Sequence, residues 1–405
     1  MTFFIVFICG SCQDRLDYRQ ILKRAGISRG ICVLLEDKAC KLAINLAQQS
    51  EFLIYVQLTS AHDAEIACRA ADDAGFYGTR IFVERGESGR IHIDDNLVDV
   101  LIVAERGTNI TESEVMRVMR PEGKAFIGRK RLTKPFPEGI DEWSHPYHGP
   151  DNNPQSEDEI ARAPYLTHFL ADPYYAPLPQ VTVASGGRVF RACGNIAFHE
   201  REEALLNSLV AYNAYNGTVL WKRKLTPGFM IHRNTFIATP EVLYVADDKS
   251  CKVIDCVSGK LKDEIIPPVE IAGGTFWKWM ALENKVLYAL IGDQEQKDPN
   301  IQSRRETHGW PWVPLSKGFN QPENPWGYGQ NLLAINPRTK KVLWSHRETE
   351  AIDSRALCMK NGRIYIYRYG TFLACLDAKD GKDIWRKTPD NSPELFNALG
   401  ASLNR

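Results

Sequence analysis

The stretch TFLACLDAKDGKDIWRK, Thr371 to Lys387, decides the fold of the second half of the chain. It contains an apolar run, an Asp-bearing turn that Gly381 closes, and a second run that holds Trp385. An Asp side chain accepts hydrogen bonds from the turn backbone, and Gly takes the positive φ that closes a tight turn. Trp offers a large apolar surface that a single hairpin cannot bury. The stretch therefore predicts a β-hairpin that packs against a neighbouring unit.

The same arrangement occurs upstream. It is complete in LVAYNAYNGTVLWK, Leu209 to Lys222. In LAINPRTKKVLWS the glycine position holds Lys340, and in CKVIDCVSGKLKD the tryptophan position holds Asp263. The steps between glycine positions are 42, 81 and 41 residues, so about one extra period lies between the second and third copies. A step of about 40 to 45 residues with two or more strands is typical of a propeller blade.

Apolar runs that precede the turns predict partner strands at Val242 to Val245, Val286 to Ile291 and Arg363 to Tyr367. The pattern small-x-Asp/Asn-x-x-x-Gly-x-x-x-Trp resembles the tryptophan-docking repeat of PQQ-like, quinoprotein-type β-propellers, from about Thr182 to Thr388. The resemblance implies a partial PQQ-like propeller of about four repeats over residues 164–405. A generic all-β sandwich with chance Trp spacing is the alternative.

Composition excludes some functions. The 405 residues include fifty basic and fifty acidic side chains, so no overall field favours nucleic acid. No apolar run reaches the roughly 20 residues of a transmembrane helix. The start of the chain, residues 1–12, fits either a remnant secretory signal or a buried first strand. Ten scattered cysteines show no paired zinc-type spacing.

Between residues 20 and 128 apolar runs alternate with amphipathic stretches, which predicts parallel strands with helices on both faces. We expect a Rossmann-like α/β domain over residues 13–130, then a linker over residues 131–163. The expected strands are Ile31–Leu35, Phe52–Leu58, Arg80–Val83, Val98–Val103 and Ala125–Ile127. The expected helices are Asp17–Ala25, Lys38–Gln49, Ala61–Ala74 and Glu112–Met119.

This layout resembles a class I S-adenosylmethionine-dependent methyltransferase, most clearly in EVMRVMRPEGKAFIG, Glu114 to Gly128, and in IHIDDNLVDVLIVAE, Ile91 to Glu105. With the connector KPFPEGIDEWSH and the repeats, the whole resembles a family of large exported proteins typical of planctomycete-like bacteria. The methyltransferase resemblance implies a cofactor site at Glu36, Asp37, Thr59, Asp94 and Asp95.

The cofactor loop departs from that family. Such enzymes carry Gly-x-Gly-x-Gly after the first strand, where a Cβ would collide with the cofactor, and an acid at the end of the second strand. Here Glu36 to Ala39 contains no glycine, and Gln57 to Thr59 contains no acid. We therefore expect a pseudo-enzyme that keeps the sheet, with S-adenosylmethionine binding as the alternative.

Two other stretches carry candidate ligand groups. His145 and His148 have a His-x-x-His spacing that suits a metal if a carboxylate joins them, but on a proline-broken loop we expect them to pack and expect no metal site. The insert from residue 293 to residue 330 is aromatic-rich and predicts either a ligand surface for a sugar or quinone, or a lid. Its candidates are Trp310, Trp312, Trp326 and Tyr328.

Together these features predict a non-catalytic cell-envelope protein, with no catalytic residue, whose propeller binds a protein, glycan or small molecule. A methyltransferase with a divergent loop is the first alternative. A quinoprotein dehydrogenase is the second; it is disfavoured because the chain has no Cys-Cys dipeptide, so we do not expect PQQ. Closed propellers of this type need about seven or eight blades, so we expect a fragment of a longer propeller or an unusually small ring.

Overall fold

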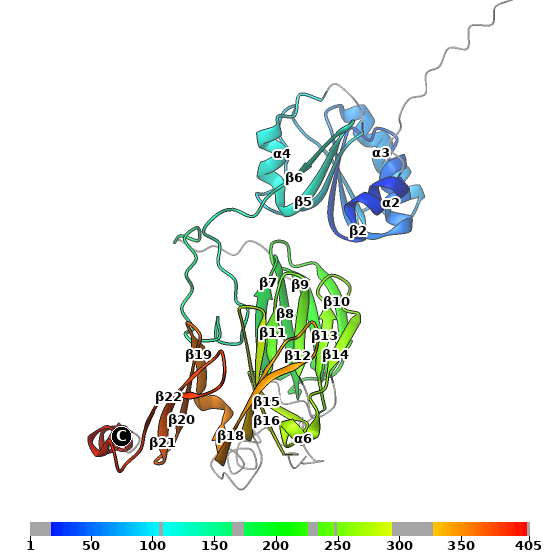
Figure 1. Ribbon diagram of the computed structural model, residues 1–405. Coiled ribbons are helices and arrows are strands. Elements are labelled where there is room, and N and C mark those ends of the chain that lie inside the picture. The colour runs from blue at the N-terminus through cyan, green and yellow to red at the C-terminus, as the bar shows by residue number, and fades with distance from the viewer. Residues whose placement is uncertain are drawn as a thin grey trace, which may run out of the picture. The chain divides into compact units, whose positions relative to one another are not determined.

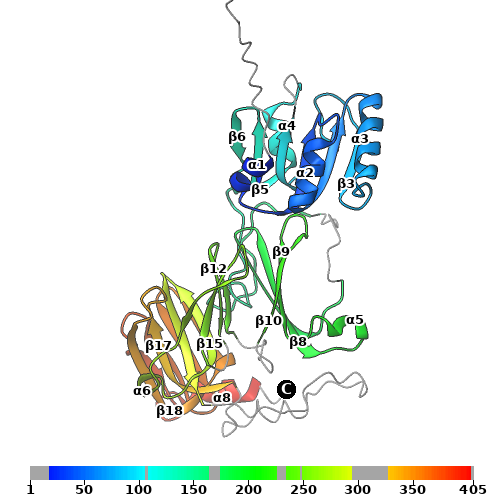
Figure 2. The ribbon, with the colours of Figure 1, turned by 90° about the vertical axis from the view of Figure 1, so that its right-hand side faces the viewer.

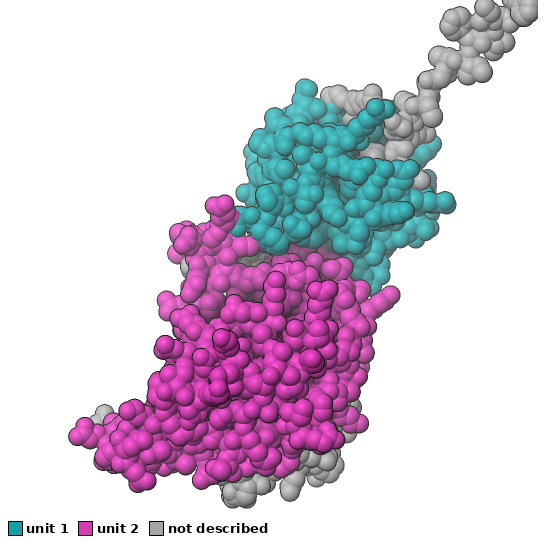
Figure 3. Space-filling view, in the orientation of Figure 1, with its two compact units in different colours: residues 1–137 teal, residues 138–405 magenta. Residues whose placement is uncertain are grey.

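The computed structural model describes residues 18–104, 108–163, 174–225, 234–246, 249–293 and 327–402. The chain divides into two compact units, residues 1–137 and residues 138–405, which Figure 3 shows in different colours. The first is an α/β unit and the second is built almost entirely of β-sheets (Figure 1). No helix in the described ranges is long and apolar enough to cross a bilayer.

Unit 1 contains a six-stranded sheet with the order β3-β2-β1-β4-β5-β6. Strands β1 to β5 pair in parallel and β6 pairs antiparallel to β5. The strands are β1 Arg29–Leu35, β2 Glu51–Leu58, β3 Ile81–Arg85, β4 Val98–Val103, β5 Met119–Ile127 and β6 Lys130–Thr133. The helices are α1 Tyr18–Ala25, α2 Lys41–Gln49, α3 Ala61–Asp73 and α4 Glu112–Val118.

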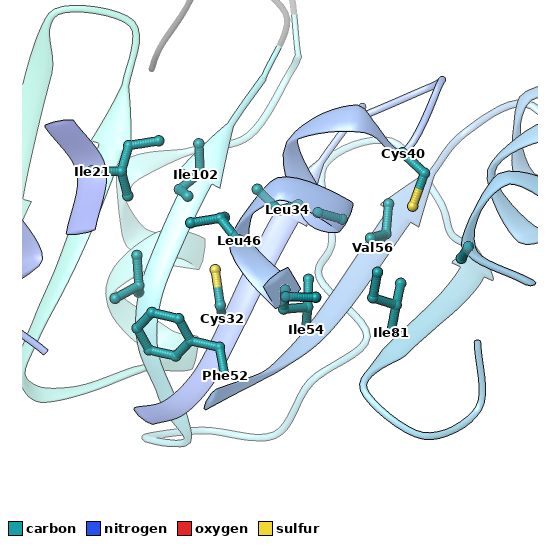
Figure 4. Packing of buried hydrophobic residues seen from close by; sticks show 14 of the residues in the cluster. Ile21, Cys32, Leu34, Cys40, Leu46, Phe52, Ile54, Val56, Ile81 and Ile102 are labelled. Atoms are coloured by element: carbon teal, nitrogen blue, oxygen red, sulfur yellow. The ribbon is translucent and has the colours of Figure 1, made fainter. Parts of the chain in front are cut away.

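The sheet of unit 1 is buried on both faces. Cys32 and Leu34 of β1 pack in the cluster that includes α1, α2 and α3, part of which Figure 4 shows. Val33 and Leu35 alternate with them and pack in the cluster that includes α4. Burial on both faces explains the nearly continuous apolar run of this strand, which is typical of parallel sheets. The predicted Rossmann-like fold is confirmed, with all the expected strands and helices.

The described residues of unit 2 form four antiparallel sheets of four strands each, here called blades 1 to 4. Blade 1 is β7 Leu178–Ser185, β8 Arg188–Ile196, β9 Ser208–Asn213 and β10 Val219–Lys224. Blade 2 is β11 Phe236–Ala238, β12 Val242–Ala246, β13 Cys251–Asp255 and β14 Leu261–Ile265. Blade 3 is β15 Phe276–Glu283, β16 Val286–Gly292, β17 Tyr328–Ile335 and β18 Val342–Asp353. Blade 4 is β19 Leu357–Lys360, β20 Arg363–Arg368, β21 Phe372–Asp377 and β22 Asp383–Lys387.

The blades follow one another in chain order. Their first strands β7, β11, β15 and β19 are neighbours in that sequence, and one apolar cluster lies between each consecutive pair of blades. Unit 2 also has short helical additions, of which Figure 2 labels α5, α6 and α8. These additions are α5 Glu200–Glu203, α6 Val269–Ala272, the 3-10 turn η1 Ser354–Ala356 and the C-terminal α8 Pro393–Ser402. The predicted four-repeat propeller architecture is confirmed.

The extra period between the second and third repeats lies largely inside blade 3. Residues between β16 and β17 account for it, and residues 294–326 of that insert lie outside the described ranges. Residues 131–163 were expected to be a linker. Residues 130–133 instead form β6 of the first sheet, and residues 138–163 belong to unit 2.

Candidate functional site

A cavity of about 220 Å³ lies at the carboxyl ends of β1 and β2 in unit 1. Ligands of open parallel sheets bind at this edge. The cavity is smaller than the about 300 Å³ at which ligand pockets usually begin. Its walls are mostly polar: Leu35, Glu36, Lys38, Gln57, Thr59, Glu87, Ser88, Gly89, Thr108, Asn109 and Ile110.

Glu36 stands in the turn where the resembling family carries glycine. Its φ is 60°, a left-handed conformation that is strained for a residue with a Cβ. Its side chain is buried, and the Oε1 atom accepts a hydrogen bond of 3.0 Å from the backbone N–H of Thr59. The side chain therefore ties the end of β1 to the end of β2.

Gln57 occupies the end of β2, where an acid would hold ribose hydroxyls. Its Nε2 atom donates to the backbone oxygen of Arg90 at 2.6 Å, and its Oε1 accepts from the N–H of His92 at 2.9 Å. A Cβ on Gly86 would lie 2.4 Å from the Gln57 Cδ, so this glycine leaves room for the amide. Gln57 is thus engaged in holding the loop that follows β3, a role that the sequence alone did not indicate.

The remaining predicted cofactor residues are not among those that line this cavity. The Oδ2 atom of Asp37 accepts the N–H of Ala43 at 2.8 Å near the start of α2. Asp95 pairs with Arg117 at 2.7 Å, and Asp94 is exposed. Of the five predicted residues, the cavity wall includes Glu36 and Thr59. The structure therefore does not bring the five together around one space.

In unit 2, residues 143–152 form a strap that crosses the first strand of every blade. Trp143 exchanges backbone hydrogen bonds with Ala184 of blade 1, at 3.0 and 2.7 Å. The Ser144 oxygen accepts from Ala238 of blade 2 at 2.9 Å. The contacts to blades 3 and 4 follow in order: Leu282 N–H to His145 Nε2 at 3.1 Å, and Met359 N–H to Pro150 oxygen at 2.7 Å.

The two histidines of this strap have structural partners. His145 is buried, and burial lowers its pKa from 6.5 to about 3, so its Nε2 stays neutral and accepts the Leu282 N–H. His148 Nε2 lies 2.9 Å from Asp141 Oδ2, and its ring contacts Trp143 edge-on at 5.2 Å. Within the described residues no His, Cys, Asp and Glu side chains gather as a metal site.

The repeat turns dock each blade on the next. The indole N–H of Trp221 in blade 1 donates to the Cys256 oxygen in the turn of blade 2, at 3.0 Å. The indole N–H of Trp344 in blade 3 donates to the Ala378 oxygen in the turn of blade 4, at 2.9 Å. A Cβ on the turn glycine would lie 2.5 Å from Trp221 at Gly259, and 2.6 Å from Trp344 at Gly381. The glycine therefore provides the space that the indole fills.

Between blades 2 and 3 both halves of this contact are replaced. Asp263 stands at the tryptophan position of blade 2, and Lys340 stands at the glycine position of blade 3 with a φ of 61°. The two side chains form an ion pair across the same interface. The sequence shows two separate departures from the repeat pattern, and the structure joins them in one interface. There an ion pair takes the place of the indole and the glycine.

A hollow of about 600 Å³ lies against blade 4 and the end of the strap. Its walls carry charged and aromatic groups: Asp151, Asn153, Cys358, Lys360, Asn361, Arg363 and Tyr365. Asp151 and Lys360 form an ion pair at 2.9 Å, which lowers the pKa of the Asp151 carboxyl against the opposing effect of burial. The sequence pattern carried no signal for this hollow, because it joins residues about 200 positions apart.

The predicted aromatic ligand surface is only partly described. Trp310, Trp312 and Trp326 lie outside the described residues. Tyr328 is the first residue of β17, where it pairs with Asp353, and burial raises the pKa of its hydroxyl. Its role as a ligand residue stays a prediction.

The sequence matches one family model and one curated protein. A family model described as outer membrane protein assembly factor BamB matches residues 329–396, which run from β17 into the C-terminal helix. The quinoprotein alcohol dehydrogenase PedE of Pseudomonas putida is 26% identical over 124 residues. This match covers 30% of the present chain and 19% of the relative, so the chain corresponds to a small part of that enzyme.

Solved structures resemble each unit separately. A Methanococcus maripaludis protein assigned as an S-adenosyl-L-methionine-dependent methyltransferase is 30% identical, with a TM-score of 0.26, and covers 27% of this chain and 52% of that one. A SAM-dependent methyltransferase from Aquifex aeolicus is 19% identical, with a TM-score of 0.25, and covers 27% and 62%. BamB from Moraxella catarrhalis is 10% identical, with a TM-score of 0.29, and covers 52% and 48%.

All three TM-scores are below 0.5, so the fold assignment rests on the strand orders given above. The chain combines a methyltransferase-like Rossmann domain with PQQ/BamB-like propeller repeats.

Proposed function

We propose that this chain is a non-catalytic interaction protein that binds its partner through the propeller and retains the Rossmann-like unit as a scaffold. One observation carries this proposal: two side chains that stand where the resembling methyltransferases hold their cofactor are engaged in internal hydrogen bonds. Glu36 bonds to Thr59, and Gln57 bonds to the backbone of residues 90 and 92. Binding the cofactor there would break these bonds in a buried place, at about 1–3 kcal/mol for each group left without a partner.

Calorimetric titration of the full chain with S-adenosylmethionine and S-adenosylhomocysteine tests the proposal. We expect no heat of binding at ligand concentrations up to the millimolar range. Exchange of the Thr59 amide with solvent, measured in the same samples, should be the same with and without ligand, because the Glu36 bond persists. Saturable binding with a Kd in the micromolar range, near −8 kcal/mol, would replace the proposal by the methyltransferase alternative.

A quinoprotein dehydrogenase is the second candidate, because of the match to PedE. The covered share of that enzyme is small, and the strap 143–152 lies across the first strands of all four blades. Under our proposal the protein gives no quinone absorption band and no calcium-dependent dye reduction after incubation with PQQ and an alcohol. A stable band together with dye reduction would establish this candidate instead.

We also propose a location in the cell envelope. The family model that matches residues 329–396 is named for an outer membrane protein assembly factor, and the apolar start of the chain fits a secretory signal. Fractionation of cells that express the full natural gene should place the protein in the periplasm or with the envelope. Recovery with cytoplasmic marker proteins would contradict this location.

A further inference from the structure

The cavity at the carboxyl ends of β1 and β2 has a buried floor. The floor consists of Leu35, Glu36 and Gln57, which are 3%, 9% and 4% exposed. The exposed residues around it are Lys38, Thr59, Glu87, Ser88 and Asn109. At about 220 Å³ the cavity has room for about seven water molecules, or for one solute of the same volume. The space therefore suits a compact polar molecule.

One carboxylate oxygen of the floor has no partner in the part of the chain that the structure describes. Glu36 uses its Oε1 atom for the Thr59 N–H, and both ends of the Gln57 amide bond to the loop after β3. Among the described residues, Glu36 forms no ion pair and its Oε2 atom accepts no hydrogen bond. A carboxylate this deeply buried is almost always paired, because an unpaired charge is costly to bury. A bound molecule with a positively charged donor would supply the missing partner.

The other groups of the cavity fit the same kind of molecule. Glu36 and Glu87 carry two negative charges and Lys38 carries one positive charge, so the described wall has a net charge of −1. An ammonium group brings a positive charge and three donors, and the hydroxyls of Thr59 and Ser88 can bond to hydroxyl groups beside it. A phosphate or carboxylate in this place would meet the Glu36 carboxylate at close range, where like charges repel.

We propose that this cavity binds a small hydroxylated primary amine, whose ammonium group donates to Glu36 Oε2. The inference goes beyond the proposed function, because it gives the scaffold unit a ligand of its own. The amine takes the oxygen that is free and leaves the bonds of Glu36 Oε1 and of Gln57 in place. Residues 108–110, just before α4, also line the cavity, so the bound amine joins this segment to the ends of β1 and β2.

The test compares serinol with glycerol, which has a hydroxyl in place of the serinol ammonium group and otherwise the same shape. The full chain is titrated with each compound, and the amide resonances of Thr59 and Ile110, two residues of the wall, report binding. We expect saturable shifts with serinol, with a Kd in the millimolar range that suits so small a ligand. Glycerol should bind at least about tenfold more weakly, because it lacks the charge that strengthens the hydrogen bond to a carboxylate.

Glu36→Gln keeps the length of the side chain and an oxygen for the Thr59 N–H but removes the charge. It should therefore weaken serinol binding at least about tenfold. Glu122→Gln is the matched control, because Glu122 also has a positive φ, 64°, but is exposed on β5 outside the cavity wall. It should bind serinol as the wild type does. A thermal melt shows whether Glu36→Gln is folded, and if it is not, the comparison of serinol with glycerol on the wild-type chain still decides.

No saturable shift with serinol up to the high millimolar range would overturn the proposal. Equal binding of serinol and glycerol, or equal binding of serinol by the wild type and a folded Glu36→Gln, would also overturn it, because charge would then not select the ligand. The S-adenosylmethionine titration is independent of these outcomes. Binding of that cofactor would refute the scaffold role of unit 1, whereas the preference for serinol and its loss in Glu36→Gln would still decide the amine site.

Discussion

At the scale of single residues, the repeat turn explains why Asx and Gly recur. In every blade the Asx side chain accepts the N–H two residues on, as Asp255 does from Val257 at 3.2 Å and Asp377 from Lys379 at 2.8 Å. The residue four positions after Asx has a positive φ, between 61° at Lys340 and 72° at Gly381. Lys340 shows that the conformation alone tolerates a side chain. Glycine is therefore required only where an indole occupies the space of its Cβ.

Gly259→Ala tests this requirement. The new Cβ meets the Trp221 ring, and the backbone keeps an unfavourable φ of 68°, so we expect a loss of about 2–4 kcal/mol in the free energy of unfolding. Gly370→Ala is the matched control, because its φ is 65° and no atom lies within 4 Å of the added Cβ. It should cost about 1 kcal/mol. Equal losses in urea unfolding of the two variants would show that Trp221 does not set the requirement.

At the scale of elements, the strap joins all four blades. It contacts the first strand of each blade in turn, and its contacts include two buried polar side chains, His145 and Asn234. Buried polar groups are costly when they lose their partners. The strap therefore couples the blades, and its polar groups make that coupling sensitive to substitution and pH.

His145 predicts a pH dependence of stability. The pKa of His145 is about 3 in the folded protein, below its ordinary value of 6.5. As the pH falls below 6.5, the unfolded chain therefore binds a proton at this residue and the folded chain does not. The contribution of His145 to the free energy of unfolding is therefore fully present above pH 6.5 and is lost between about pH 6.5 and pH 3. The loss is on the order of 2 kcal/mol by pH 5. In thermal melts of the full chain, His145→Gln should weaken this pH dependence of the stability of unit 2. The variant His62→Gln, at an exposed position of unit 1, should leave the pH dependence as in the wild type. A wild-type slope retained in His145→Gln would contradict the assignment.

Asn152 predicts how the strap holds blade 4. Its Nδ2 donates to the Leu357 oxygen at 2.6 Å, and its Oδ1 accepts from Asn234 at 3.1 Å. Asn152→Gly keeps the φ of 55° without strain but removes both hydrogen bonds. We therefore expect the free energy of unfolding to fall by about 1–3 kcal/mol, and the Met359 amide to exchange faster with solvent. Asn361→Gly, at a φ of 53° in an exposed turn, is the control and should change neither. Unchanged exchange in Asn152→Gly would show that the strap is not held there.

At the scale of the whole molecule, the sequence predicted the architecture because both halves have strong periodicities. Parallel strands such as Cys32 to Leu35 are apolar on both faces, and the Asx-Gly-Trp spacing repeats at about 41 residues. The strap was not predicted, because its hydrogen bonds join backbone groups far apart in the chain. The pairing of Asp263 with Lys340 was also missed, although both departures were visible, since register between blades is not encoded within one repeat. At the cofactor edge the sequence showed which groups are missing, but not that Glu36 and Gln57 bond internally.

The account of unit 2 rests on one rule: the residue at the tryptophan position of a blade is matched to the residue at the glycine position of the next. The most direct test is a double-mutant cycle of Asp263→Trp and Lys340→Gly, measured by urea unfolding of the full chain. In the single variant Asp263→Trp the new indole would meet the Lys340 side chain, whereas loss of the exposed ion pair alone should have little effect on stability. We predict that Lys340→Gly stabilises the Asp263→Trp chain, with a coupling energy of at least about 1 kcal/mol. Effects that add within about 0.5 kcal/mol would contradict the rule.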